Sequence, residues 1–179
     1  MATNEIVLPI TRPETEWLRG RARQKMSPTF DHSRVQVILA ARLEAWGNKL
    51  GRVGTEWRFR VAPPGEVRRP LVPDLSFVRL DRLRSHDRAD IQAPEFAPDI
   101  AFEILSPGYR RADVNDKVDV LLRSGSELVV VVDPAKRTVR LHDAHGEHSL
   151  DTTDVLRHIA LPGFELELAP FFSEALDFA

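Results

Sequence analysis

Apolar side chains recur at helical spacing over residues 34–50, and this periodicity predicts an amphipathic helix. Asp31 or Ser33 is placed to cap its start, while Gly47 and Gly51 offer points at which it can end. Glu44 falls on the opposite side and is expected to face solvent. The stripe expected to face the protein core consists of Val35, Leu39, Leu43, Trp46 and Leu50.

Two stretches after this helix have the period of a β-strand. Residues 53–61 alternate between apolar and charged positions, which indicates a strand with one buried face. Pro63, Pro64 and Gly65 then mark a turn, and a second strand is expected over residues 71–80. The two strands are expected to pair as a hairpin with a long loop.

The segment from Pro98 to Leu122 predicts a buried strand followed by a helix. Residues 100–105 are apolar on both faces apart from Glu103, as in a strand at the centre of a sheet. Asp113 can cap the helix that follows the Ser-Pro-Gly break. The aliphatic residues 127–132 then complete a strand–helix–strand unit, in which the two strands run parallel.

The rest of the chain carries weaker patterns. Residues 138–142 and 164–168 predict short strands, and residues 171–176 an amphipathic tail or short helix. Residues 1–30 are predicted to be an N-terminal arm, either a short helix or a segment packed on the body or on a partner subunit. The expected organisation is one domain over residues 31–179, with an α/β (α+β) fold built on a central mixed β-sheet flanked by helices.

Composition is that of an ordinary globular domain, with 179 residues, 42% of them hydrophobic and 29% charged. No apolar run has the length of a membrane span and no secretory signal is evident, so a cytoplasmic location is expected. The absence of cysteine excludes disulfides and thiolate metal sites. The net charge of −2 argues against a protein that coats nucleic acid by bulk attraction, although arginines crowd residues 52–88.

Three residues suggest chemistry because of their positions in these elements. Glu103 lies among apolar neighbours, where a carboxylate needs a cationic partner or a metal ion. Asp74 begins the preceding core strand, so the two carboxylates converge if the strands are neighbours. Lys117 lies three residues after Val114 and four before Leu121, on the packed flank of its helix. Two carboxylates suit Mg²⁺ or Mn²⁺, and a nearby lysine can stabilise charge during phosphodiester hydrolysis.

Structural roles can explain the same residues without catalysis. Asp74 follows a proline and can cap a turn, and Glu103 can form an internal ion pair with Arg110 or Lys117. The six histidines do not fall at metal-ligand spacings, and a polar surface loop is expected over residues 142–148. Asp113 and Asp116 are expected to be helix caps or solvated charges. Residue types alone leave the functional and structural interpretations open.

Several short motifs accompany these residues from about residue 30 onward. They are His32, Val-Pro-Asp74-Leu-Ser-Phe-Val, Pro98-Asp99-Ile-Ala-Phe-Glu103-Ile-Leu-Ser106-Pro107, Lys117, Val-Val-Asp133-Pro134 and Leu161-Pro162-Gly163. Together they resemble the PD-(D/E)xK nuclease superfamily and, more narrowly, the Uma-type family of restriction endonucleases. The usual lysine of the superfamily stands two residues after the acid, a position occupied here by Leu105. In the Uma-type family the lysine comes from the following helix, which makes Lys117 its match.

The resemblance implies a restriction-endonuclease-like core and a metal-dependent DNA endonuclease. It implies Asp74 and Glu103 as ligands of Mg²⁺ (or Mn²⁺) and Lys117 as the catalytic lysine. DNA is then the expected substrate, and a homodimer would bring two sites to the two strands. Two alternatives remain open, because fold does not fix function. One is a catalytically silent nuclease fold that binds nucleic acid or protein, and the other is a phosphodiesterase acting on small substrates.

Overall fold

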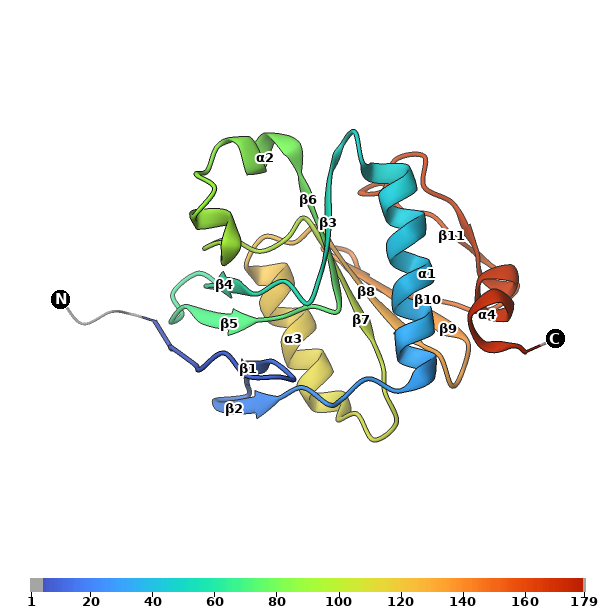
Figure 1. Ribbon diagram of the computed structural model, residues 1–179, viewed down its shortest axis with the longest axis horizontal. Coiled ribbons are helices and arrows are strands. Elements are labelled where there is room, and N and C mark those ends of the chain that lie inside the picture. Colours follow the sequence, from blue (N-terminus) through green and yellow to red (C-terminus); the bar gives the residue numbers. More distant parts are fainter. Residues whose placement is uncertain (1–4, 179) are drawn as a thin grey trace.

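A six-stranded mixed β-sheet forms the centre of the computed structural model, which describes residues 5–178 (Figure 1). Neighbouring strands are antiparallel except for β7 and β8, the parallel pair of the strand–helix–strand unit. In spatial order the strands are β10 (Gly146–Leu150), β9 (Thr138–Asp143), β8 (Leu128–Asp133), β7 (Ile100–Ile104), β6 (Leu75–Arg79) and β3 (Gly51–Thr55). The predicted fold class, a central mixed sheet with flanking helices, is confirmed.

Helices cover both faces of this sheet (Figure 1). The helices α1 (Phe30–Gly47) and α4 (Leu168–Leu176) pack on one face, and α3 (Arg111–Arg123) packs on the other. A short helix α2 (Leu80–Arg84) and a 3₁₀ turn η1 (Asp90–Gln92) belong to the connection between β6 and β7. Over residues 5–178, none of the helices combines the length and the apolar character that crossing a membrane requires.

The alternation of side chains along β7 divides the interior into two apolar cores. Ile100, Phe102 and Ile104 face the core under α1 and α4, and Ala101 faces the core under α3. Because Glu103 is two residues from Ala101, its side chain lies on the α3 face. This alternation directs the one acid of the strand toward the helix that carries Lys117.

Three small two-stranded sheets complete the fold, and one of them is built from the N-terminal segment. That segment forms a hairpin that contacts both α3 and β5. The short helix considered for residues 1–30 is therefore wrong over the hairpin. The pairs are β1 (Thr15–Leu18) with β2 (Arg21–Gln24), β4 (Phe59–Val61) with β5 (Arg69–Leu71), and β11 (Val155–Leu156) with β12 (Leu166–Glu167).

The single strand predicted over residues 53–61 is wrong, because the chain leaves the sheet at Glu56. Glu56 has a φ of 49°, in the left-handed region, and this turns the backbone between β3 and β4. Its N–H donates to the carbonyl of Asp74 at 3.3 Å. The break carries β4 out of the central sheet and places Glu56 next to Asp74.

The strand predicted over residues 71–80 is likewise divided, at Val72-Pro73-Asp74. Pro73 has no N–H to give to a neighbouring strand, and the N–H of Val72 donates to the Glu16 carboxylate at 2.6 Å. The hairpin pairing predicted for the two stretches is confirmed in both halves, since β3 pairs with β6 and β4 with β5. The break between β5 and β6 frees backbone groups that the site described below uses.

Smaller differences concern helix starts and short strands. Thr29 caps α1 and Arg110 precedes α3, so none of the predicted caps holds. The polar loop expected over residues 142–148 is instead the hairpin of β9 and β10, in which His148 pairs with Leu141. Only Leu166 and Glu167 are extended in the strand predicted over residues 164–168, because α4 begins at Leu168.

Candidate active site

The two carboxylates singled out from the sequence face each other across adjacent strands. Leu75 pairs with Phe102 in the antiparallel β6–β7 ladder, so Asp74, one position earlier, lies opposite Glu103. Both are buried, with 3% and 8% of the residue exposed. Asp74 is also fixed by the backbone of β7, because its Oδ2 accepts the N–H of Ile104 at 2.6 Å.

Lys117 projects from α3 into the same centre. Its Nζ lies 2.8 Å from Oε1 of Glu103 and 2.6 Å from Oε1 of Glu16, and it donates to the carbonyl of Val72 at 2.9 Å. Only 3% of the residue is exposed. The ion pair between Glu103 and Lys117, one of the alternatives considered from the sequence, is therefore present.

A second lysine, Lys25, reaches the site from the segment between β2 and α1. Its Nζ lies 2.6 Å from Oδ1 of Asp74 and 2.8 Å from Oε2 of Glu56, and it donates to the carbonyl of Val72 at 3.0 Å. Thus the Val72 carbonyl, freed by the break between β5 and β6, accepts from both lysines. Each carboxylate of the pair has its own ammonium partner.

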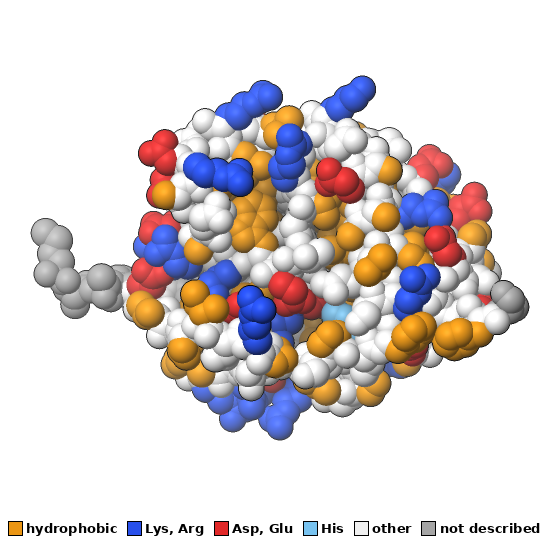
Figure 2. Space-filling view, in the orientation of Figure 1, with side chains coloured by type: hydrophobic (Ala, Val, Ile, Leu, Met, Phe, Trp, Pro, Cys, Tyr) orange, Lys and Arg blue, Asp and Glu red, His pale blue; other side chains and the backbone are white. Residues whose placement is uncertain are grey.

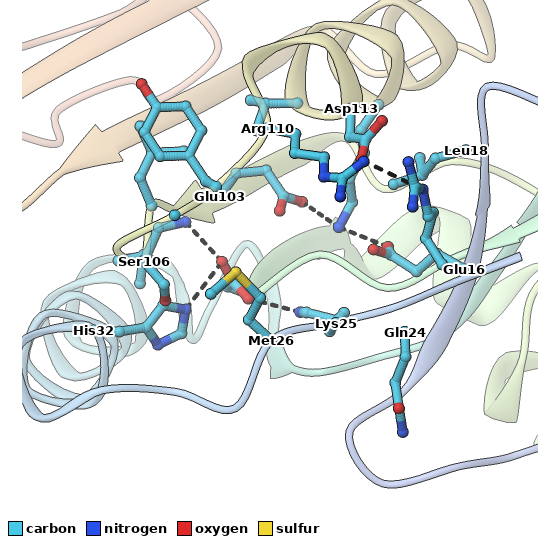
Figure 3. Close-up of a pocket in the computed structure, with 18 residues that line it drawn as sticks. Glu16, Leu18, Gln24, Lys25, Met26, His32, Glu103, Ser106, Arg110 and Asp113 are labelled. Atoms are coloured by element: carbon cyan, nitrogen blue, oxygen red, sulfur yellow. Dashed lines mark hydrogen bonds and ion pairs between the residues drawn. The ribbon is translucent and has the colours of Figure 1, made fainter.

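Glu16 and His32 complete the buried shell around these four residues. Glu16 in β1 accepts the Val72 N–H and contacts Lys117, so it links the N-terminal hairpin to the site. His32, in the first turn of α1, places Nε2 3.3 Å from Oδ2 of Asp74. Figure 3 shows His32, Glu103, Glu16 and Lys25 converging on one centre from separate parts of the chain.

The pKa of Asp74 is set by the balance between burial and cationic neighbours. Burial alone would raise it, but Lys25, His32 and Lys117 together hold it well below the ordinary range. Burial likewise works against the Lys25 ammonium, yet the surrounding carboxylates, Asp74 first, raise the pKa of Lys25 above its ordinary value. Asp74 and Lys25 are therefore charged throughout the physiological pH range.

Glu103 is shifted in the opposite direction from Asp74. Burial is the largest influence and, with the neighbouring Asp74 charge, it raises the pKa of Glu103 to about 8 despite the opposing effect of Lys117. The pKa of Lys117 is also raised, because Glu103 and Glu16 outweigh the effect of burial. The two carboxylates of the pair thus differ in charge state near neutral pH.

A pocket of about 420 Å³ opens onto this centre. Its polar wall includes Glu16, Lys25, Asp74, Glu103 and Lys117. The backbone of residues 104–106 and the start of α3 form much of the remaining wall, where Figure 3 shows Arg110 and Asp113. A pocket with several charged groups converging on it has the form of a binding or catalytic site.

The donor set fits a hard divalent cation held by two carboxylates and water. Within residues 5–178, no group of three or more His, Cys, Asp or Glu side chains is arranged to hold a metal ion. Asp74 and Glu103 nonetheless offer oxygen ligands from adjacent strands, and buried Oε1 of Glu103 accepts no hydrogen bond from a described residue. Oxygen-only ligation with retained water suits Mg²⁺. An ion bound here would take the place of ammonium contacts on these carboxylates.

Sequence reasoning did not assign a role to Glu16, Lys25 or His32. His32 belongs to the motifs that carry the family resemblance, so a signal for it existed. Lys25 lies in an arginine-rich stretch without periodicity, and Glu16 lies in a strand of only four residues. Neither has a local pattern that separates it from a surface charge.

Comparison with known proteins places this arrangement in a family. The model of the family described as "Uma2: Putative restriction endonuclease" matches residues 8–169. The chain belongs to this family. The resemblance inferred from the motifs is thereby confirmed.

A solved structure has the same fold. It is described as a "putative nuclease belonging to DUF820" from Anabaena variabilis and is 24% identical in sequence, with a TM-score of 0.84. The match covers 94% of this chain and 95% of that chain. At this identity the likeness establishes the fold alone. A search of curated proteins found no match.

Proposed function

We propose that the protein is a Mg²⁺-dependent (or Mn²⁺-dependent) endonuclease that hydrolyses DNA phosphodiester bonds. The observation that carries this proposal is the buried pair Asp74 and Glu103, at opposed positions of adjacent strands, with Lys117 2.8 Å from Glu103. Membership of a family described as restriction endonucleases supports the same reaction class. In this proposal Asp74 and Glu103 are the metal ligands and Lys117 is the catalytic lysine.

Each residue has a distinct part in the proposed reaction. A divalent ion supplies an acid that orients the phosphodiester and lowers the pKa of the attacking water. Asp74, already ionised, is the fixed ligand, and Glu103 must lose its proton to become the second. Lys117 keeps its proton because its pKa is raised, so it stabilises negative charge on the phosphate and does not act as the base. Glu16 and the Val72 carbonyl hold its ammonium in position.

Lys25 contributes to the site in the absence of metal. Its ammonium contacts the same Asp74 oxygen that faces away from the Ile104 N–H. A cation entering between the carboxylates competes with this contact. We therefore expect Lys25 to shift toward Glu56 or toward a phosphate oxygen of the substrate when the ion binds. A homodimer working in the cytoplasm would bring two such sites to the two strands of a DNA duplex.

The test combines metal binding with cleavage. Supercoiled plasmid is incubated with Mg²⁺ and wild-type protein, Asp74→Asn, Glu103→Gln or Asp119→Asn. The last is the control, because Asp119 is an exposed acid on the outer face of α3. We expect nicking by wild type and control, and a loss of at least about a hundredfold in the two site variants. Calorimetric titration with Mg²⁺ should show binding that both site variants lose.

Other outcomes separate the alternatives. Absence of both Mg²⁺ binding and cleavage in the wild type would refute the nuclease and leave a catalytically silent binding module. Mg²⁺ binding with turnover of bis(p-nitrophenyl) phosphate but intact plasmid would instead indicate a phosphodiesterase acting on small substrates.

A further inference from the structure

A second hollow lies on the same face of the molecule as the carboxylate pocket. It has a volume of about 840 Å³ and is bounded by β3, Trp57, α2 and the segment around η1. Figure 2 shows its apolar floor bordered by basic side chains, above the mouth of the carboxylate pocket. We refer to this hollow as the arginine groove. Trp57, Leu80, Leu83 and Ile91 contribute its apolar surface, and Arg52, Arg58, Arg84 and Arg88 its basic side chains.

The charge of the arginine groove is not compensated within the protein. Its two acids are already engaged, since Glu14 pairs with Arg58 and Glu56 pairs with Lys25. In contrast, the side chains of Arg84 and Arg88 are exposed, and neither forms a hydrogen bond or ion pair with a residue between 5 and 178. Exposed arginines that the fold does not use are available to anionic ligands, and Arg suits phosphate oxygens in particular.

The floor of the groove holds an aromatic ring in a fixed position. Trp57 Nε1 donates to the carbonyl of Ile91 at 3.0 Å. The indole lies directly against Gly54, where a Cβ would stand 2.9 Å from Trp57 Cε3. A ring placed in this way beside arginines matches the surfaces that bind unpaired nucleic acid, in which bases stack on aromatic side chains and the backbone follows positive charge.

The groove is also connected to the proposed catalytic centre. Glu56 lines the groove, and its Oε2 contacts Lys25 Nζ at 2.8 Å. The same ammonium contacts Asp74 at 2.6 Å. One carboxylate and one ammonium therefore separate the groove from Asp74, so a strand seated in the groove can continue to the metal ligands.

Resting on the nuclease function proposed above, we infer that the arginine groove binds an unpaired strand of nucleic acid. Its bases lie over Trp57 and the neighbouring aliphatic side chains, and Arg84 and Arg88 hold its phosphates. A paired duplex exposes its phosphates but not the faces of its bases, so it would leave the apolar floor uncovered. The substrate favoured by the groove is therefore a single strand, or the unpaired end or bubble of a duplex, and not an intact duplex.

The experiment measures binding without turnover. Fluorescein-labelled single-stranded DNA of 12 nucleotides and the matching duplex are titrated in EDTA with wild type and with Arg84→Ala/Arg88→Ala. A charge-matched control, Lys136→Ala/Arg157→Ala, removes two cations outside the groove. We expect the wild type to bind the single strand at least about fivefold more tightly than the duplex. The groove variant should lose about tenfold in affinity and show a salt dependence reduced by one to two phosphate contacts, by roughly 0.7 per contact.

A second readout reports contact with the floor. Binding of the single strand should quench tryptophan fluorescence in the wild type, and Trp57→Phe should remove most of this quenching. Equal single-strand affinity in the groove variant and the charge-matched control would overturn the inference, as would a wild type that prefers the duplex. Because EDTA removes the metal, these outcomes are independent of plasmid cleavage. A protein that binds single strands through the groove but never cleaves would refute only the proposed reaction.

Discussion

The affinity for Mg²⁺ should depend steeply on pH because one of the two proposed ligands is protonated near neutrality. Burial raises the pKa of Glu103 to about 8, whereas Asp74 stays ionised. A metal ion binds the carboxylate and not the acid, so binding must expel the proton. Lowering the pH below 8 therefore weakens binding, and raising it strengthens binding until Glu103 is ionised in the free protein.

The size of this effect follows from the titration of a single group. One pH unit below the pKa, about one molecule in eleven carries the ionised form, so the apparent affinity should change by about tenfold per pH unit. Between pH 6 and pH 9 the total gain is about a hundredfold, equivalent to roughly 2.7 kcal/mol. At pH 7 each bound ion should release about 0.9 proton.

Calorimetry can measure both quantities. Mg²⁺ is titrated into the protein at several pH values, in pairs of buffers that differ in ionisation enthalpy, so that the heat reports the number of protons released. Glu103→Gln serves as the comparison and should show weak binding without proton release. If the wild type binds Mg²⁺ with the same affinity at pH 6 and pH 9 and releases no proton, Glu103 is not a titrating ligand and the reasoning is wrong.

Three further predictions concern the buried lysines and a close-packed glycine. Lys25→Met should tighten Mg²⁺ binding by about tenfold in a calorimetric titration, because the ion no longer displaces an ammonium, and equal or weaker affinity would contradict this competition. Lys117→Met leaves buried carboxylates without their cation and should lower the free energy of unfolding in urea by about 3–5 kcal/mol, whereas the exposed Lys136→Met should change it by less than about 0.5 kcal/mol. Gly51→Ala should cost more than about 3 kcal/mol, since its Cβ would lie 2.4 Å from the Val78 carbonyl oxygen. In the same urea titrations Gly65→Ala, which has a positive φ but no neighbour within 4 Å, should cost only about 1 kcal/mol, and similar losses for the two glycine variants would refute the steric argument.

The elements with strong periodicity could be predicted from the sequence because burial imposes the pattern directly. The helix at residues 30–47 and the strand–helix–strand unit around Glu103 have long apolar stripes, and both are present in the fold. The extended strands predicted at residues 53–61 and 71–80 are each divided, because alternation does not record where a strand changes partners. Glu56 leaves the sheet by a left-handed φ, which a non-glycine sequence does not announce.

The candidate site was only partly visible in the sequence for a related reason. Asp74, Glu103 and Lys117 belong to periodic elements or motifs, so their positions on a face could be inferred. Lys25 and Glu16 reach the site from the N-terminal segment, and only the packing of β1 on β5 and α3 brings them there. Contacts between residues far apart in the sequence carry no local signal, and a lysine in an arginine-rich segment has the composition of a solvated surface.

The break at Val72-Pro73-Asp74 connects these observations, since a continuous strand through it would remove the site. In an unbroken strand the Val72 N–H and carbonyl would be candidates for the ladder, whereas here they bind Glu16, Lys25 and Lys117. Pro73 prevents one ladder hydrogen bond by its chemistry, and the side chains from the N-terminal hairpin satisfy the backbone groups thus freed. The N-terminal hairpin is therefore part of the candidate active site, because its Glu16 orients the lysine that contacts Glu103.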